Sequence, residues 1–243
     1  PAKALPTTSG MMIALSAETG AVVAILRDEG WLTDLRTALA GAIATRAGMR
    51  ADARRIGIVG AGTQARFQIR AAAHLLRERE PFFAVWARSP EKLEALRSDL
   101  AGEGIAVEPV AELEALCAQS DALITVTPAA APIIRNDWVR PGTHITALGA
   151  DAPGKQELDT ALVALADTRI ADSLEQSLDH GEFAAAAAVG LIDAGDCVEL
   201  GAVLAGDMPA RRSNDDITVA DLTGIAVQDI AIARVVLDGI GDR

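Results

Sequence analysis

The first apolar segments of the chain are two short runs of β-favouring residues, at positions 11–16 and 21–26. The polar and small residues at positions 17–20 separate them and suit a reversing turn, so we expect a β-hairpin. Apolar residues then recur at helical spacing over positions 31–46. The pattern therefore predicts a hairpin followed by a helix.

From position 54 the pattern changes to short apolar runs that alternate with amphipathic segments. Such alternation is typical of a parallel sheet covered by helices on both faces. We expect one sheet over about residues 54–172. Its predicted strands are 56–59, 82–86, 123–126 and 144–148, and its predicted helices are 63–76, 90–100 and 112–117.

The last third of the chain contains a short predicted strand at 217–220 and a predicted helix at 224–237 that could pack on the hairpin. The longest apolar stretch, 183–192, is Ala-rich and about half of the roughly 20 residues that a membrane span needs. We interpret that stretch as a packed helix and expect no membrane partner.

Composition and charge narrow the classes of partner. The net charge is −12, Tyr is absent, and Phe and Trp together number seven (4 + 3), so we expect no nucleic-acid partner. Cys117 and Cys197 belong to no C-x-x-C pair, which supports neither a disulfide framework nor a metal site. A reducing, cytoplasmic setting is the expectation.

A glycine-rich turn follows the first predicted strand of the sheet. Residues 60–65 read G-A-G-T-Q-A and run directly into a predicted helix. In a G-x-G-x-x-A turn, the first Gly permits the tight bend, the second lets the backbone approach a pyrophosphate, and the Ala permits close packing. The helix N-terminus favours the anion. The context predicts a dinucleotide-binding Rossmann unit rather than a merely tight turn, with the cofactor at Gly60, Gly62, Thr63, Gln64 and Ala65.

The end of the second predicted strand bears on the choice of cofactor. An acidic residue there binds the ribose of NAD, whereas a basic residue accommodates the 2′-phosphate of NADP. Arg88 can stack on adenine and meet the phosphate, Ser89 can donate a hydrogen bond, and Lys92 adds positive charge. These residues favour NADP(H), with NAD(H) as the alternative. The competing interpretation is that Arg88 and Lys92 are ordinary solvated charges.

A second motif stands directly after the strand predicted at 144–148, at the edge of the sheet where ligands bind. Residues 149–158 read G-A-D-A-P-G-K-Q-E-L and resemble the G-A-D-x-P-G-K-x-E-L motif of the ornithine cyclodeaminase/mu-crystallin family. Three further segments resemble that family: Leu5-Pro6-Thr7, Leu35-Arg36-Thr37-Ala38 and residues 221–229. The resemblance covers essentially the whole chain.

The resemblance implies roles for individual residues. It makes Asp151 the catalytic carboxylate and Thr63 and Gln64 contacts of the pyrophosphate loop. The remaining implied contacts are Thr127 and Leu148 on the cofactor, and Arg36, Lys155 and Thr223 on the substrate side.

Two of these residues have simpler interpretations when the resemblance is set aside. Asp151 could cap the turn that leads to Glu157. Arg36 could form a surface ion pair with Asp34 or Glu29. Both alternatives involve ordinary structural contacts.

The fold implied by the resemblance is α/β, a Rossmann doubly wound sheet plus a second domain formed from both chain ends. We expect the Rossmann domain at 51–214 and the second domain at 1–50 and 215–243. Family members carry a longer N-terminal segment, so the second domain is expected to be incomplete, partly missing at the N-terminus of this chain. Because second domains of the family associate, we also expect a homodimer.

The family implies an NAD(P)-dependent enzyme that acts on a small amino acid or imino acid. The first hypothesis is ornithine cyclodeaminase, which converts L-ornithine to L-proline and ammonia and regenerates its cofactor in each turnover. One alternative is an NADPH-dependent imine or ketimine reductase of the pyrroline-carboxylate, iminosuccinate or alanine dehydrogenase type. Another is a mu-crystallin-like protein that binds NADPH and a small ligand.

Overall fold

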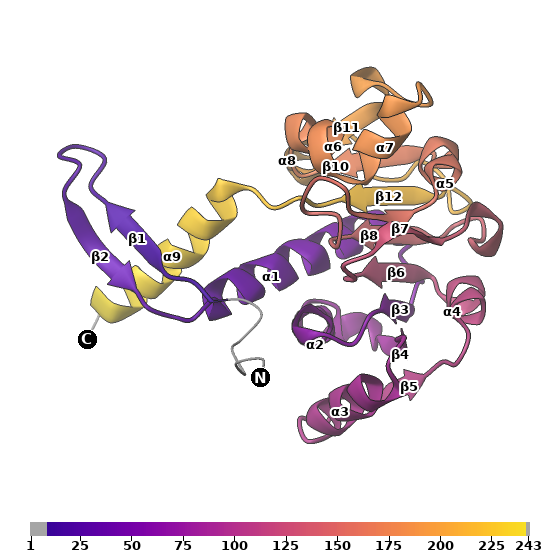
Figure 1. Ribbon diagram of the computed structural model, residues 1–243, viewed down its shortest axis with the longest axis horizontal. Coiled ribbons are helices and arrows are strands. Elements are labelled where there is room, and N and C mark those ends of the chain that lie inside the picture. The colour runs from indigo at the N-terminus through magenta and orange to yellow at the C-terminus, as the bar shows by residue number, and fades with distance from the viewer. Residues whose placement is uncertain (1–8, 242–243) are drawn as a thin grey trace, which may run out of the picture. The chain divides into compact units, whose positions relative to one another are not determined.

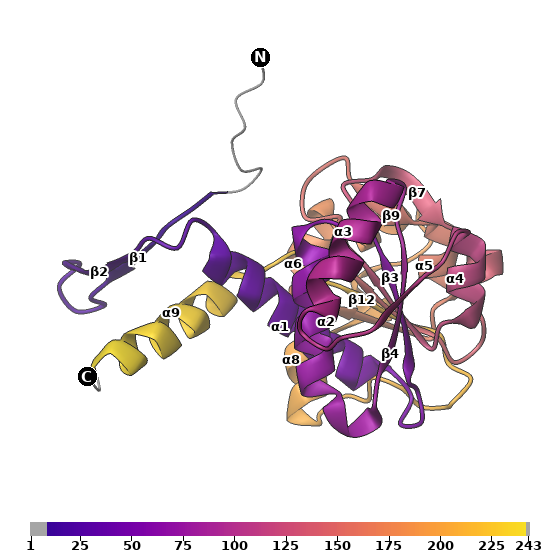
Figure 2. The same cartoon turned by 90° about the horizontal axis from the view of Figure 1, so that it is seen from below.

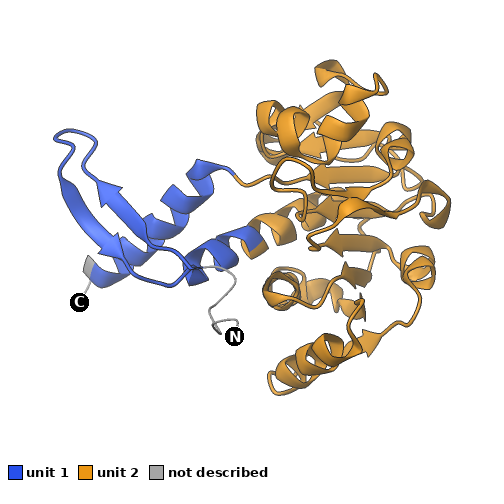
Figure 3. Cartoon of the chain, viewed as in Figure 1, with its two compact units in different colours: residues 1–37, 225–243 blue, residues 38–224 orange. Residues whose placement is uncertain are grey.

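The computed structural model describes residues 9–241. The chain forms two compact units, residues 1–37 with 225–243, and residues 38–224 (Figure 3). The segment Leu5-Pro6-Thr7 lies outside the described residues.

The larger unit is built on an eight-stranded sheet whose neighbouring strands, among the described residues, all pair in parallel (Figure 1). The spatial order is β11-β10-β12-β8-β6-β3-β4-β5. In chain order these strands are β3 (Arg55–Val59), β4 (Phe82–Trp86), β5 (Val107–Pro109), β6 (Ala122–Thr125), β8 (His144–Ala147), β10 (Thr168–Ala171), β11 (Cys197–Glu199) and β12 (Thr218–Asp221).

Helices cover both faces of this sheet (Figure 2). Every residue of β6, β8 and β12 is buried, because apolar cores form on both sides of these strands. One core includes side chains from α2 (Thr63–Leu75), α3 (Pro90–Ala101) and α8 (Leu200–Ala205). The other includes side chains from α4 (Leu113–Gln119), α5 (Thr160–Leu165), α6 (Leu174–His180) and α7 (Glu182–Ala188).

The order of the strands confirms the doubly wound fold. The chain passes outward from β3 to β4 and β5, and then returns to place β6 on the other side of β3. The loops after β3 and β6 therefore diverge at the carboxyl edge of the sheet, which is the position where ligands bind in open α/β sheets.

The predicted limit of the sheet near residue 172 is wrong. β11 pairs with β10, and β12 enters between β10 and β8. The short run predicted at 217–220 is thus an interior strand of the sheet. It is fully buried between partners that are distant in sequence, so local pattern alone did not place it.

A two-stranded parallel ribbon joins the segments that follow β6 and β8. It pairs β7 (Ala130–Ile134) with β9 (Gln156–Leu158). At its two ends Gln156 N–H donates to the carbonyl of Ala129 at 2.9 Å, and Asp159 N–H donates to that of Ile134 at 3.0 Å. The ribbon therefore holds the two loops beside each other.

The smaller unit contains the predicted hairpin, β1 (Met12–Leu15) and β2 (Val22–Leu26), paired antiparallel. Helix α1 (Trp31–Gly48) begins in this unit after Asp28, whose carboxylate accepts the N–H of Leu32 at 2.6 Å. Helix α9 (Ala226–Gly241) contacts β1, which confirms the predicted packing of the closing helix on the hairpin. In the part of the chain that the structure describes, no helix combines the length and apolarity needed to cross a membrane.

Candidate functional site

A cleft of about 300 Å³ opens at the carboxyl edge of the sheet, where the chain switches direction between β3 and β6. Three segments line it: residues 60–62 after β3, residues 86–89 with Lys92 around the end of β4, and residues 126–129 with Ile133 after β6. The cleft brings the two cofactor motifs of the sequence into one site.

The glycine turn has the geometry that its sequence predicts. Gly60 has a φ of 123°, a value that favours glycine, and its N–H donates to the carbonyl of Trp86 at 2.8 Å. Gly62 precedes α2, which has no side-chain cap, and a Cβ at Gly62 would meet nothing within 4 Å. Ala65 is fully buried beneath the turn. This start of α2 suits a pyrophosphate.

The end of β4 carries the positive charge of the cleft. Arg88, Ser89 and Lys92 all line it, and its described lining residues include no carboxylate. The Ser89 hydroxyl caps α3 by accepting the N–H of Lys92 at 3.3 Å and donates to Glu91 Oε2 at 2.8 Å. That donated bond lowers the pKa of Glu91. Arg88 and Lys92 are thus the cations that the described lining of the cleft presents to an anionic ligand.

The G-A-D-A-P-G-K-Q-E-L motif forms a loop between β8 and β9. Gly149 begins the loop at a point where a Cβ would collide with the Thr127 carbonyl oxygen and the Glu157 carboxylate. Gly154 has a φ of 81°, which again favours glycine. Lys155 Nζ donates to Asp151 Oδ1 at 2.5 Å. The exposed fractions of the two side chains are 34% and 54%, so both remain accessible to a ligand.

Asp151 has a charged partner within its own loop. Its carboxylate binds the ammonium group of Lys155, four residues later in the chain. The structure therefore brings together the residue predicted as catalytic and one of those predicted to bind substrate. Their roles stay predictions.

Glu157 is the residue of this site that sequence reasoning missed. It is fully buried, and its carboxylate accepts four hydrogen bonds. Burial raises the pKa of Glu157, and the bonds from Thr125, Thr127 and Gly149 oppose that rise. Its place inside the motif was a signal, but the sequence did not show that the side chain points into the protein.

Two more buried carboxylates lie behind Glu157. Glu182 accepts the N–H groups of Glu157 at 2.7 Å and Leu158 at 3.0 Å. Burial and the neighbouring carboxylate of Asp221 raise the pKa of Glu182 to about 8. Asp221 accepts the N–H of Phe183 at 3.2 Å, and burial raises its pKa to about 7. The carboxyl edge thus contains several acidic groups shielded from water.

Arg36 lies in the smaller unit, where its Nη1 donates to Gln228 Oε1 at 2.9 Å and its Nε lies 3.2 Å from Asp229 Oδ1. The carboxylate at this contact belongs to Asp229 in the first turn of α9, a partner that the sequence did not identify. Two segments that carry the family resemblance meet at this contact.

The remaining predicted residues are held by the fold of the larger unit. Thr223 follows β12, and its N–H donates to Asp172 Oδ1 at 3.1 Å. Its hydroxyl lies 3.1 Å from the same oxygen and 3.3 Å from Gln176 Oε1. Leu148 is buried, and its N–H donates to the Thr125 carbonyl at 3.0 Å. Thr63 and Gln64 form the first turn of α2.

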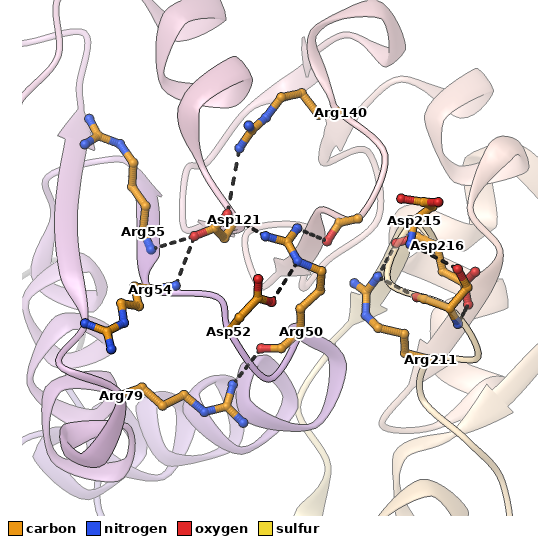
Figure 4. Close-up of polar contacts among 12 residues, drawn as sticks. Arg50, Asp52, Arg54, Arg55, Arg79, Asp121, Arg140, Arg211, Asp215 and Asp216 are labelled. Carbon is orange, nitrogen blue, oxygen red and sulfur yellow. Dashed lines mark hydrogen bonds and ion pairs between the residues drawn. The ribbon is translucent and has the colours of Figure 1, made fainter.

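The opposite, amino-terminal edge of the sheet has a different chemistry (Figure 4). Asp121 accepts the N–H groups of Arg54 and Arg55 at 3.0 Å each and an N–H of the Arg50 guanidinium at 2.9 Å. Burial acts to raise the pKa of Asp121, but these donors outweigh it and lower the pKa. At this edge, the Asp121 carboxylate is therefore paired with a charged guanidinium, that of Arg50.

A glycine turn that opens a helix at the switch point of a parallel, doubly wound sheet defines a dinucleotide-binding protein of the Rossmann class. The chain belongs to the ornithine cyclodeaminase/mu-crystallin family, whose model matches residues 1–243.

Solved structures of relatives agree with this assignment. The iminosuccinate reductase of Paracoccus denitrificans in complex with NAD+ is 39% identical, with a TM-score of 0.85 over 94% of this chain and 69% of that one. An archaeal alanine dehydrogenase dimer with bound NAD is 36% identical, with a TM-score of 0.89 over 97% and 72%. A lysine cyclodeaminase is 33% identical, with a TM-score of 0.86 over 98% and 67%. The relatives are enzymes of small amino and imino acids.

Proposed function

We propose that this protein is an NADPH-dependent reductase that converts a small α-imino acid into the corresponding amino acid. The observation that carries the reductive direction is the pair of cations, Arg88 and Lys92, at the end of β4 in the cleft. A 2′-phosphate would complement them, and NADPH is the usual donor for net reduction. The resemblance to iminosuccinate reductase supports the substrate class.

The residues of the cleft fit a dinucleotide. The uncapped start of α2 and the open space at Gly62 would hold the pyrophosphate, and Thr127 would lie beside the nicotinamide ring. When bound, NADPH supplies the hydride that adds to the carbon of the substrate C=N bond. The chain has to bind the substrate, supply a proton to the nitrogen and exclude water from the imine.

The pair formed by Asp151 and Lys155 is suited to the proton step. Asp151 would pass a proton to the substrate nitrogen as the hydride reaches the neighbouring carbon. Lys155 would bind the substrate carboxylate. Both side chains are partly exposed, so a substrate can displace their mutual contact. An imino acid, NADPH and one proton taken up from solvent would thus give the amino acid and NADP+.

The cofactor preference has its own test. Arg88→Ala removes a guanidinium from the cleft, so we expect the ratio of kcat/KM for NADPH to that for NADH to fall about tenfold or more. Arg97→Ala is a matched control, because Arg97 lies later on α3 and binds Glu94 rather than the cleft. An unchanged ratio in Arg88→Ala would contradict the assignment of NADPH.

Ornithine cyclodeamination is the second candidate, favoured by the similarity to lysine cyclodeaminase. The two reactions differ in cofactor balance, because the reductase consumes NADPH whereas the cyclodeaminase regenerates its cofactor. Purified protein is incubated with cyclic and linear α-imino acids and NADPH, and separately with L-ornithine and substoichiometric NADP+. Stoichiometric loss of NADPH supports the reductase. Proline in large excess over cofactor would overturn it in favour of the cyclodeaminase.

We also infer that the protein is a homodimer that associates through one face of the hairpin. Ile13 pairs with Ile25 and Leu15 with Val22, and each of these side chains is more than half exposed. Such a contiguous apolar face is unusual on a monomer. The Ile13→Glu substitution should yield monomers in light scattering, whereas Leu165→Glu, at an exposed leucine of the larger unit, should not. A monomeric wild-type protein would contradict the inference.

A further inference from the structure

Glu157 connects the two loops that border the predicted reaction centre. Its Oε1 accepts the N–H of Thr127 at 2.6 Å and lies 2.7 Å from the Thr127 hydroxyl. Its Oε2 accepts the Thr125 hydroxyl at 2.6 Å and the N–H of Gly149 at 2.9 Å. The carboxylate thus joins the chain that follows β6 to the chain that follows β8.

These four donors match the acceptor capacity of an ionised carboxylate, which offers about four lone-pair positions on two oxygens. The side chain is fully buried, so water cannot replace a lost donor. The Thr127 hydroxyl is turned inward to Glu157, and a Cβ built on Gly60 would lie 3.4 Å from the Thr127 methyl group. Glu157 therefore sets the rotamer of a residue that lines the cofactor cleft.

The same carboxylate closes the loop that carries Asp151 and Lys155. Gly149 begins that loop and Glu157 follows it, so the bond between them ties its two ends together. The approach is close enough that a Cβ at Gly149 would collide with the Glu157 carboxylate. Together with the ribbon of β7 and β9, this buried side chain therefore sets the position of the Asp151 loop relative to Thr127.

We propose that Glu157 is a positioning residue for hydride transfer, which holds the nicotinamide-side contact Thr127 in register with the loop of Asp151. The proposal rests on the proposed function as an NADPH-dependent reductase. Glu157 itself does not line the cleft and acts through Thr127 and Gly149.

The test is the variant Glu157→Gln, which keeps the shape of the side chain but turns one acceptor group into a donor. Because misplacement of reacting groups by about 1 Å can cost about a hundredfold, we expect kcat to fall about ten- to a hundredfold. The Kd for NADPH, measured by nicotinamide fluorescence, should change by no more than about threefold, since the pyrophosphate turn is untouched.

An isotope effect separates positioning from simple loss of folded enzyme. With NADPH deuterated at the transferred position, Glu157→Gln should show a larger isotope effect on kcat than wild type, because hydride transfer becomes slower than product release. A smaller folded fraction would lower the apparent kcat and leave the isotope effect unchanged. Thr125→Val is a second variant, which removes one hydrogen bond to Glu157 without changing a residue that lines the cleft. It should also lower kcat and raise the isotope effect, but by less than Glu157→Gln.

Asp121→Asn is the matched control, because Asp121 also accepts several hydrogen bonds but lies at the amino-terminal edge of the sheet (Figure 4). It should keep the wild-type kcat per folded molecule and the wild-type isotope effect. The proposal would be overturned if folded Glu157→Gln had the kcat and the isotope effect of wild type. If Glu157→Gln does not fold, the same result in Thr125→Val would overturn it. Failure of wild type to bind NADPH or reduce any imino acid would instead overturn the proposed function.

Discussion

The carboxylates at the two edges of the parallel sheet have opposite surroundings. At the amino-terminal edge, Asp121 is paired with the guanidinium of Arg50 and with two backbone N–H groups, and its pKa is lowered (Figure 4). At the carboxyl edge, Glu157 and Glu182 accept hydrogen bonds from hydroxyl and backbone amide groups, and burial raises their pKa values.

This difference reflects the two tasks of the edges. At the amino-terminal edge, the contacts of Asp121 join the start of β6 to the start of β3 and to the segment that follows α1. Neutral donors at the carboxyl edge can satisfy a buried carboxylate without adding positive side chains beside the cleft. The cations that do line the cleft, Arg88 and Lys92, thus remain available for a ligand. Substitutions at the amino-terminal edge should therefore lower stability, whereas substitutions beside the cleft should lower activity.

The largest expected effect comes from replacing one carboxylate at each edge. Asp151→Asn should lower turnover about 10²- to 10⁴-fold, because a general acid or base is lost, with little change in the Kd for NADPH. Asp121→Asn should leave turnover per folded molecule unchanged and lower the free energy of unfolding by about 1–3 kcal/mol. Steady-state kinetics and denaturant unfolding measure the two effects. Equal losses of turnover and NADPH affinity in Asp151→Asn would contradict the catalytic assignment.

Two glycines of the carboxyl edge give the next largest effects. A Cβ at Gly62 would meet open space, and the backbone there is extended, so Gly62→Ala should stabilise the fold by about 0.4–1 kcal/mol. The same methyl group would obstruct a pyrophosphate, so the Kd for NADPH should rise about tenfold or more. A stabilised variant with wild-type affinity would show that the cofactor phosphates lie elsewhere.

Gly149→Ala provides the contrast, because its Cβ would collide with the Thr127 carbonyl and the Glu157 carboxylate. Overpacking of this kind typically costs about 1–3 kcal/mol of unfolding free energy. The variant should lose both stability and turnover. Wild-type stability in Gly149→Ala would contradict the close approach on which the loop geometry depends.

The parts of the fold that sequence predicted are those that local pattern encodes. The turn at residues 60–65 combines a strand, two glycines and a helix within a few residues, and the structure contains each of them. The hairpin and its following helix are local in the same sense. The position of β12 was not predictable in this way, because its partners β8 and β10 precede it by some 50–75 residues in the chain.

In the candidate site, too, contacts between residues close in sequence were predictable, whereas contacts between distant residues were not. The motifs identified Asp151 and Lys155, whose mutual contact spans four residues. Arg36 and Asp229 meet across most of the chain, so the partner of Arg36 was missed. Glu157 was missed for another reason: charged residues are rarely fully buried, and nothing in a single sequence marks the exception.

The smallest expected effect is the pH dependence of stability, which differs in sign between the edges. The pKa of Glu182 is raised from 4.5 to about 8. Between these values the folded state binds more protons than the unfolded state, so this contribution is fully present below pH 4.5 and is lost as pH rises toward 8. The pKa of Asp121 is lowered, so its contribution is present above its ordinary value and is lost as pH falls through its folded value.

The contribution of Glu182 to the free energy of unfolding is best measured between pH 6.5 and 8. Below that range His144, whose pKa is lowered to about 3 by burial and by Arg211, adds a slope of the opposite sign. Above pH 6.5 the opposing slope of His144 fades as its unfolded form loses its remaining charge, while Asp221, with its pKa near 7, adds to the fall. We expect the free energy of unfolding to decrease on the order of 1 kcal/mol across this window.

Glu182→Gln should flatten that decrease, whereas Asp121→Asn should leave it intact and instead flatten the acid limb below about pH 4. Urea unfolding at a series of pH values measures both slopes. The same slope between pH 6.5 and 8 in wild type and Glu182→Gln would show that Glu182 is ionised in the folded protein. The carboxyl edge would then need a cationic partner, and the contrast between the two edges would fail.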